Sequence, residues 1–213
     1  IGEEWPDHDE RYVRSEEFIR SLKGIWTQDN FSFDGKYYQF KDYTLKPKPL
    51  QQPHPPIWIG ANADPAIKRA ARMGDCWYIP PHNEITTIVR QLDVYKRELD
   101  VVNKPFPEEL PMRREVFVAP SRREALRICG PYLAGKYKNY TDWGQSDQLP
   151  DDDSKLDQAF EDLIGDRFLL GSPDEVASQI IDLNRQVGVN HLIMSMDWAG
   201  MPKEATLDCM QLF

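Results

Sequence analysis

The alternation of apolar and polar positions along this chain predicts helices and short strands that follow one another in turn. In residues 9–27, apolar residues recur every three or four positions with charged residues between them, which is the spacing of an amphipathic helix. The same spacing predicts further helices over residues 65–73, 85–99, 122–138 and 173–187. Short apolar runs predict strands at residues 57–60, 76–79, 115–119 and 191–196. Strand followed by helix, repeated, is typical of a parallel sheet.

A β-hairpin and two irregular segments interrupt this rhythm. The segments FSF and KYYQF flank Asp34-Gly35, a pair that suits a tight turn because both residues tolerate positive φ. Residues 46–56 contain five prolines, which exclude a helix or a central strand and predict an extended surface connection. Residues 139–155 are rich in Asp, Gln, Gly, Ser and Pro, so we expect a mobile loop there that could close as a lid.

Composition narrows the class of protein. The chain has 213 residues, 40% hydrophobic content and no apolar run long enough to span a membrane, so we expect a soluble protein with a sizeable core. The formal net charge of −9 disfavours nucleic acid and anionic membranes as partners, because those partners usually meet a basic surface. The three cysteines are widely spaced and fit neither a disulfide framework nor a metal site. We therefore expect no bound metal and a reducing, cytoplasmic compartment.

The most informative segment is residues 55–77, where a short strand runs into a Gly-Ala-Asn turn and then into an alanine-rich helix. Small residues at such a turn leave backbone N–H groups accessible at the helix N-terminus, where the helix dipole favours a phosphate. An ordinary strand-to-helix connection has the same local pattern, so the pattern alone leaves both interpretations open.

Three motifs together resemble the C-terminal two-thirds of the bacterial-luciferase-like monooxygenases, a family of flavin-dependent enzymes. In the family's order and spacing, they are FSFDGKYYQF, LKPKPLQQPHPPIWIGANADPAIKRAARMGDCWYIPP and FLLGSPDEVASQIIDLNRQVGVNHLIM. The resemblance implies an α/β fold, the (β/α)8 TIM barrel, of which this chain supplies roughly the second half. That half comprises strands 5–8, the fourth helix and a hairpin insertion, with residues 1–213 forming a single domain.

The resemblance also implies where a cofactor binds. Reduced FMN, or a deazaflavin in one branch of the family, has its phosphate near the turn after the fifth strand. That position carries over to Gly60, Ala61, Asn62 and Ala63.

The DHDERY stretch resembles the start of the fourth helix in the long-chain alkane and the sulfonate or aminocarboxylate branches, where a histidine and a tyrosine stand one turn apart. Here these residues are His8 and Tyr12. A spacing of four puts both on one face of a helix, from which they could reach the same phosphate. An exposed histidine and a packing tyrosine would fit the spacing equally well. Trp77 and Tyr78 are candidates for contact with the substrate, although aromatic residues on barrel strands more often belong to the core.

The function implied by the resemblance is a monooxygenase that uses reduced FMN and O2 to oxidise a small organic substrate, with a flavin reductase allowed as a partner. Two alternatives stay open: a deazaflavin-dependent oxidoreductase that transfers hydride, and a non-catalytic flavin-binding half-barrel. No catalytic acid or base is predicted, because the first four strands of the barrel are missing. We expect either a fragment of a longer polypeptide or a half-barrel that covers its sheet edges by pairing as a homo-oligomer.

Overall fold

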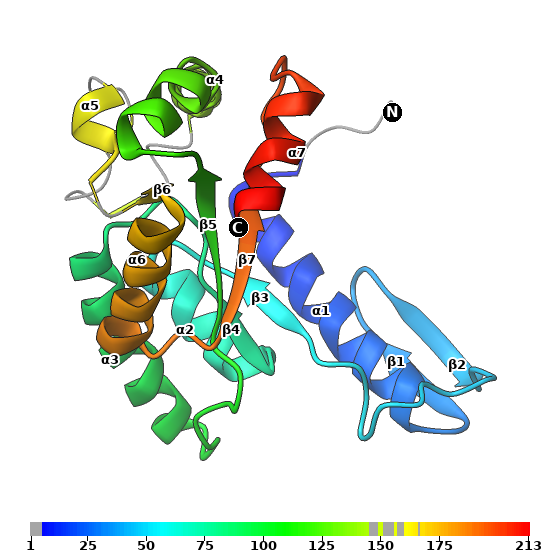
Figure 1. Cartoon of the computed structure of the whole chain (residues 1–213). Coiled ribbons are helices and arrows are strands. Elements are labelled where there is room, and N and C mark those ends of the chain that lie inside the picture. The colour runs from blue at the N-terminus through cyan, green and yellow to red at the C-terminus, as the bar shows by residue number, and fades with distance from the viewer. Residues whose placement is uncertain (1–5, 145–148, 151–155, 157–159, 166) are drawn as a thin grey trace. The chain divides into compact units, whose positions relative to one another are not determined.

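The structure is a computed structural model that describes residues 6–144, 149–150, 156, 160–165 and 167–213 (Figure 1). The side chains of His8, Phe160 and Glu161 also lie outside the described part. The chain divides into two compact units, Ile1–Ile57 and Trp58–Phe213. None of the helices in the described part has the length and apolar content that crossing a membrane requires.

The first unit consists of one helix and one hairpin. Helix α1 (His8–Thr27) confirms the helix predicted from apolar spacing, and the carboxylate of Asp7 caps it by accepting a hydrogen bond from the N–H of Glu10 at 2.8 Å. Strands β1 (Phe31–Asp34) and β2 (Gln39–Tyr43) pair antiparallel, which confirms the hairpin. Residues 44–57 form neither helix nor strand, which confirms the irregular connection predicted for residues 46–56. The strand predicted to begin at Ile57 begins at Trp58.

The hairpin turn is longer than the sequence predicts. Asp34 pairs directly with Gln39, so the loop has four residues, 35–38, in place of the tight Asp34-Gly35 turn. The physical reason is helix α1, where Glu17 holds the loop through its carboxylate. This carboxylate accepts hydrogen bonds at 2.9, 2.8 and 3.3 Å from the N–H groups of Lys36, Tyr37 and Tyr38. A long-range contact of this kind leaves no local mark in the sequence.

The second unit is built on parallel strands. They are β3 (Trp58–Gly60), β4 (Cys76–Tyr78), β5 (Pro111–Val118), β6 (Phe168–Gly171) and β7 (His191–Ser195). Strand β3 pairs with β4, and β5 pairs with β6 on one edge and with β7 on the other. A parallel bridge between Ile79 and Met112 connects the end of β4 to β5. Four of these strands confirm the predicted ones, and the parallel arrangement with helices confirms the α/β class.

Strand β6 was not predicted. Its four residues directly precede the Gly-Ser-Pro helix start, and the sequence interpretation used this segment only as the entry to the helix. In the structure all four residues are buried, and they pair with the C-terminal half of β5. A four-residue strand carries too little periodicity to stand out beside a strong helix signal.

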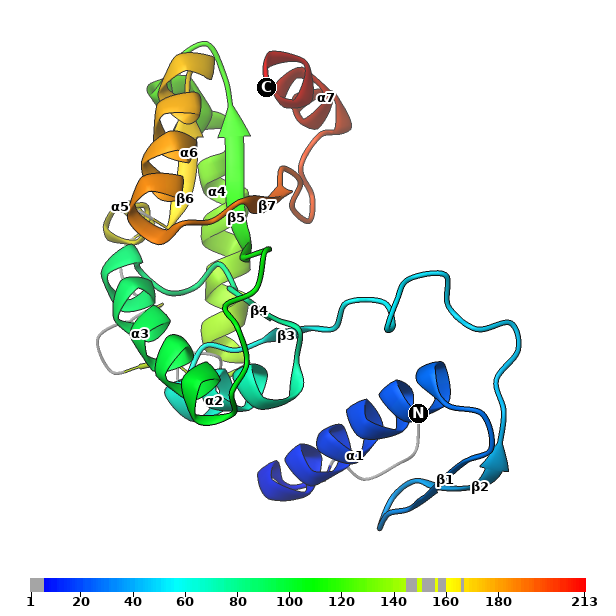
Figure 2. The same ribbon diagram turned by 90° about the horizontal axis from the view of Figure 1, so that it is seen from below.

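Helices connect the strands and cover them. They are α2 (Asp64–Met73), α3 (Ile85–Val101), α4 (Arg122–Asp142), α5 (Phe160–Leu163), α6 (Pro173–Val187) and α7 (Lys203–Leu212). Helix α2 packs against α3, and α3 packs against α6 (Figure 2). Ser172 and Glu175 form a capping box at the start of α6, and Gly188 ends it with a φ of 80°, a conformation that glycine adopts without strain.

Helix α4 corrects one boundary of the predicted mobile loop. The helix continues to Asp142, so residues 139–142 are helical and not part of a loop. The extension is stabilised by aromatic packing, because the ring of Tyr140 lies 5.6 Å from that of Tyr137 in an edge-on arrangement. Much of the remaining segment, residues 145–148 and 151–155, lies outside the described residues, so the mobility of that loop stays a prediction.

Candidate functional site

The turn between β3 and α2 contains the four residues predicted to contact a phosphate, Gly60, Ala61, Asn62 and Ala63. It is built from small residues, and Gly60 at the end of β3 is exposed. A Cβ atom added at Gly60 would lie 3.2 Å from the ring of Tyr78, so glycine is the residue that leaves this approach open. Ala63 is the N-cap of α2, and no side chain in the described part of the chain caps this helix end. The geometry therefore fits an anion at backbone N–H groups.

Buried side chains hold the carbonyl groups of this turn. The indole Nε1 of Trp77 donates a hydrogen bond to the carbonyl oxygen of Ala61 at 2.9 Å. The side-chain amides of Gln91 and Asn83 both donate to the carbonyl oxygen of Asn62. Sequence reasoning did not single out Asn83 or Gln91, because neither lies in the turn and neither belongs to a recognisable motif.

The two predicted substrate contacts occupy different environments. Trp77 is fully buried and packs against the ring of Tyr95 at 5.7 Å, so it shapes the turn from the core and presents no exposed surface. Tyr78 is partly buried next to Gly60, and burial raises the pKa of its hydroxyl above the usual range. A contact between Tyr78 and a substrate stays a prediction.

His8 and Tyr12 lie in the first turns of α1, in the first unit, whereas the turn after β3 belongs to the second unit. Tyr12 is partly buried, and the side chain of His8 lies outside the described residues. Their approach to a phosphate at Gly60 therefore stays a prediction from the resemblance.

A second cluster of polar residues, which the sequence did not reveal, surrounds Glu115 on β5. The side chain of Glu115 is fully buried, and its carboxylate pairs with the ammonium group of Lys136 from α4. The same carboxylate accepts a hydrogen bond at 2.8 Å from the indole N–H of Trp198, in the loop after β7. Three segments far apart in the sequence are thus joined at one buried charge.

A cavity of about 580 Å³ opens beside this cluster, between α4 and the loop after β7. Its walls include the cations Arg113 and Lys136 and the aromatic rings of Tyr140 and Trp198. Arg113 donates hydrogen bonds from Nε and Nη2 to the hydroxyl oxygen of Ser195 on β7, at 2.9 and 2.7 Å. We call this space the β5 cavity. It combines positive charge with aromatic surface, which suits a planar or anionic organic ligand.

His82, in the loop after β4, is a buried neutral group near this cavity. Its ring makes edge-on contacts with the rings of Tyr137 and Tyr140, at 6.3 and 5.0 Å. Burial, together with the surrounding cations, first Lys136, lowers the pKa of His82 to about 4. The imidazole is therefore uncharged near neutral pH, and its Nδ1 atom has no hydrogen-bond partner within the described part of the chain.

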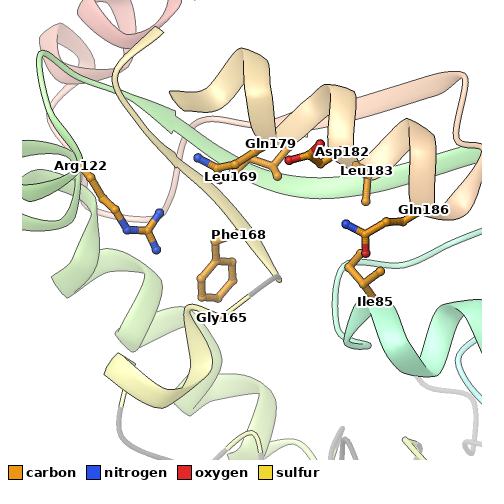
Figure 3. Close-up of a pocket in the computed structure, with 9 residues that line it drawn as sticks. All are labelled: Ile85, Arg122, Gly165, Phe168, Leu169, Gln179, Asp182, Leu183 and Gln186. Carbon is orange, nitrogen blue, oxygen red and sulfur yellow. The ribbon is translucent and has the colours of Figure 1, made fainter. Parts of the chain in front are cut away.

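A smaller cavity of about 360 Å³ lies between α3, β6 and α6 (Figure 3). Two of its polar side chains are engaged with the backbone of β6: Gln179 bonds both the N–H and the carbonyl oxygen of Leu170, and Arg122 donates to the same oxygen. Because these groups stabilise the strand, we assign this cavity no role in binding.

Among the described residues there is no cluster of side chains that could hold a metal ion, and all three cysteines are free and buried.

Comparison with known proteins places these features in a family context. A family model described as luciferase-like monooxygenase matches residues 1–191. The FMNH2-dependent dimethylsulfone monooxygenase of Pseudomonas putida is 38% identical over 217 residues, which cover 92% of this chain and 56% of that protein. An F420-dependent glucose-6-phosphate dehydrogenase of Amycolatopsis mediterranei is 27% identical over 199 residues, covering 90% of this chain and 57% of that protein.

Among solved structures, the monooxygenase RslO1 from Streptomyces bottropensis matches with a TM-score of 0.72 at 21% identity, over 97% of this chain and 60% of that one. A match at this level of identity shows a shared fold. The chain thus spans little more than half the length of the curated relatives named above.

Proposed function

Because this chain belongs to the luciferase-like monooxygenase family, we propose that it serves a flavin-dependent monooxygenase that uses reduced FMN and O2 to oxidise a small organic substrate. The observation that carries the proposal is the 38% identity to an FMNH2-dependent dimethylsulfone monooxygenase across nearly the whole chain. The turn after β3, with its small residues and uncapped helix N-terminus, supports it independently because it fits a phosphate.

FMN is the proposed cofactor, with its phosphate at Gly60, Ala61, Asn62 and Ala63 and with His8 and Tyr12 as additional ligands. When bound, reduced flavin supplies the chemistry that activates O2, and the protein supplies binding, orientation and exclusion of water. Tyr78 is the proposed aromatic contact beside this turn, because its ring lies against Gly60.

The β5 cavity is the proposed place for the organic substrate. Arg113 and Lys136 supply positive charge there, and Tyr140 and Trp198 supply apolar surface that excludes water. The neutral imidazole of His82 lies behind this wall, and Glu115 holds Lys136 and Trp198 in place. We assign no catalytic acid or base, because no side chain of this cluster is shown to touch a reacting atom.

The proposed architecture is the second half of a TIM barrel. The order β3, β4, β5, β7 then corresponds to barrel strands 5–8, and residues 1–213 to a single domain. In the described structure β3 pairs only with β4, and β7 only with β5, so each has an edge that the other half of a barrel would cover. We further propose a homo-oligomer, a cytoplasmic location and a flavin reductase as the source of reduced flavin.

The proposal is tested first by binding and then by turnover. Oxidised FMN added to the purified chain should lose much of its fluorescence and show a shifted absorption band on binding. With reduced FMN and O2, adding dimethylsulfone as the first probe substrate should then give oxidised product in place of part of the hydrogen peroxide that reduced flavin forms on its own. Absence of any FMN binding would refute the cofactor assignment, and binding without turnover of any substrate would favour the non-catalytic alternative.

A deazaflavin-dependent oxidoreductase is the second candidate, favoured by the 27% identity to an F420-dependent dehydrogenase. The two candidates differ in their need for O2, because hydride transfer to a deazaflavin consumes none. Parallel titrations with FMN and with F420, followed by an assay of product formation with and without O2, therefore distinguish them.

A further inference from the structure

The two peptide carbonyls of the turn after β3 are held from the core side. The oxygen of Ala61 accepts the indole N–H of Trp77, and the oxygen of Asn62 accepts the side-chain amides of Asn83 and Gln91. Trp77 and Gln91 are fully buried, and Asn83 is 2% exposed. Water therefore does not compete for these bonds, and breaking one leaves a buried polar group without a partner.

The three donors are themselves fixed. Asn83 donates to the side-chain oxygen of Gln91 at 2.8 Å, which orients both amides toward the turn. The carbonyl oxygen of Asn83 accepts a hydrogen bond from Arg114 on β5 at 3.2 Å. The ring of Trp77 packs against Tyr95 on α3. Three buried donors that converge on two carbonyl oxygens favour one arrangement of the turn.

A planar trans peptide points its N–H opposite to its carbonyl. With the oxygens of Ala61 and Asn62 held toward the core, the N–H groups of Asn62 and Ala63 point away from it. No backbone carbonyl in the described part of the chain accepts a hydrogen bond from either N–H. Both lie at the N-terminus of α2, where Pro65 contributes no N–H of its own.

We infer that Trp77, Asn83 and Gln91 are positioning residues for the cofactor phosphate: from the core, they hold two successive backbone N–H groups in the direction of the anion. This inference rests on the proposed function, since it takes FMN as the ligand of the turn. The three side chains touch the peptide carbonyls and not the phosphate, so they act on affinity through the orientation of the amides.

The phosphate dependence of flavin binding tests this inference. The affinities of FMN and of riboflavin, which lacks the phosphate, are measured by fluorescence titration of the full chain. The ratio of the two affinities reports the phosphate alone. In Trp77→Phe, which keeps an aromatic ring but removes the N–H, and in Gln91→Met, which keeps the length but removes the donor, we expect this ratio to fall about tenfold. Riboflavin affinity should stay within about twofold.

Gln179→Met is the matched control. Gln179 is a glutamine that also bonds a backbone carbonyl, but on β6 and away from the turn. Its replacement should leave the FMN-to-riboflavin ratio unchanged. A wild-type chain that binds both flavins equally, or neither, would refute the proposed phosphate site itself. A wild-type preference for FMN that persists in both folded variants would overturn only the positioning role.

A second measurement uses only the wild-type chain, so it does not depend on the folding of any variant. In the wild-type chain labelled with 15N, FMN should shift the amide resonances of Asn62 and Ala63 strongly downfield, whereas riboflavin should not. If those two resonances respond identically to both flavins, the inference is wrong regardless of the variants.

Discussion

The turn after β3 and the β5 cavity present polar groups in opposite ways. At the turn, the backbone faces the proposed ligand, and side chains such as Trp77 and Gln91 stay buried behind it. At the cavity, the side chains themselves form the wall, and one buried carboxylate, Glu115, joins them. The comparison implies that the two regions differ in what a substitution changes. Substitutions at the exposed surface of the turn should lower FMN affinity, whereas substitutions of the buried groups behind the cavity should mainly lower the free energy of unfolding.

The largest effect is expected from Glu115→Ala. Removing one partner of a buried ion pair leaves the other without compensation, and here it also removes the acceptor of the Trp198 indole. We expect the free energy of unfolding to fall by about 3 to 5 kcal/mol. Urea denaturation monitored by circular dichroism measures this loss.

The control variant for Glu115→Ala changes a residue on α4, the helix that contains Lys136, the ion-pair partner of Glu115. Lys138 and Asp142 form an exposed ion pair on α4, and Lys138→Ala should cost less than about 1 kcal/mol. Equal losses in the two variants would contradict the view that the Glu115 cluster stabilises the fold.

The second effect is a dependence of stability on pH that originates at His82. The folded-state pKa is about 4, against an ordinary value of 6.5, so the unfolded chain binds a proton between these values that the folded chain does not. Stability is therefore complete above pH 6.5 and falls as the pH drops, by about 3 kcal/mol on reaching pH 4.

The variant His82→Gln isolates this contribution, because it removes the titrating group while carboxylates elsewhere titrate as before. The difference in unfolding free energy between wild type and variant should change across pH 4 to 6.5 and be constant above that range. A difference that is independent of pH would show that His82 is not buried as a neutral group.

The contrast between the two regions also explains what the sequence could predict. The turn at residues 60–63 was found because its small residues are contiguous and stand between a strand and a helix. Helices α1 and α6 were predicted for the same reason, since their periodicity is local. The cluster at Glu115 was missed because its partners are 21 and 83 residues away, and nothing within the strand MRREVFV marks its glutamate.

Other features that the sequence did not predict also depend on contacts between residues far apart in the chain. The length of the hairpin loop depends on Glu17, which is about twenty residues from the amides that it binds. The roles of Asn83 and Gln91 depend on how α3 packs against α2. Local sequence therefore predicts elements and turns, whereas side chains that hold a turn from the core become visible only in the tertiary structure.

The third effect tests whether a substitution at the exposed surface of the turn after β3 lowers FMN affinity and leaves stability nearly unchanged. Gly60→Val adds a branched side chain against the ring of Tyr78 at an exposed position next to the proposed phosphate. We expect FMN affinity to fall about tenfold, a loss of about 1.4 kcal/mol. The free energy of unfolding should change by less than about 1 kcal/mol, because valine favours a strand conformation. A large loss of stability without loss of FMN affinity would contradict the proposed difference between the two regions.

The smallest effect is expected from Tyr12→Phe, which removes a single hydroxyl. If that hydroxyl donates to the cofactor phosphate, FMN affinity should fall about threefold, which corresponds to the lower end of the free energy that one hydrogen bond contributes. Riboflavin affinity should not change. Tyr43→Phe is the matched control, since Tyr43 is an exposed tyrosine on the hairpin of the same unit. An unchanged FMN affinity in Tyr12→Phe would remove the hydroxyl of Tyr12 from the proposed phosphate site and leave the assignment to the backbone of the turn and to His8.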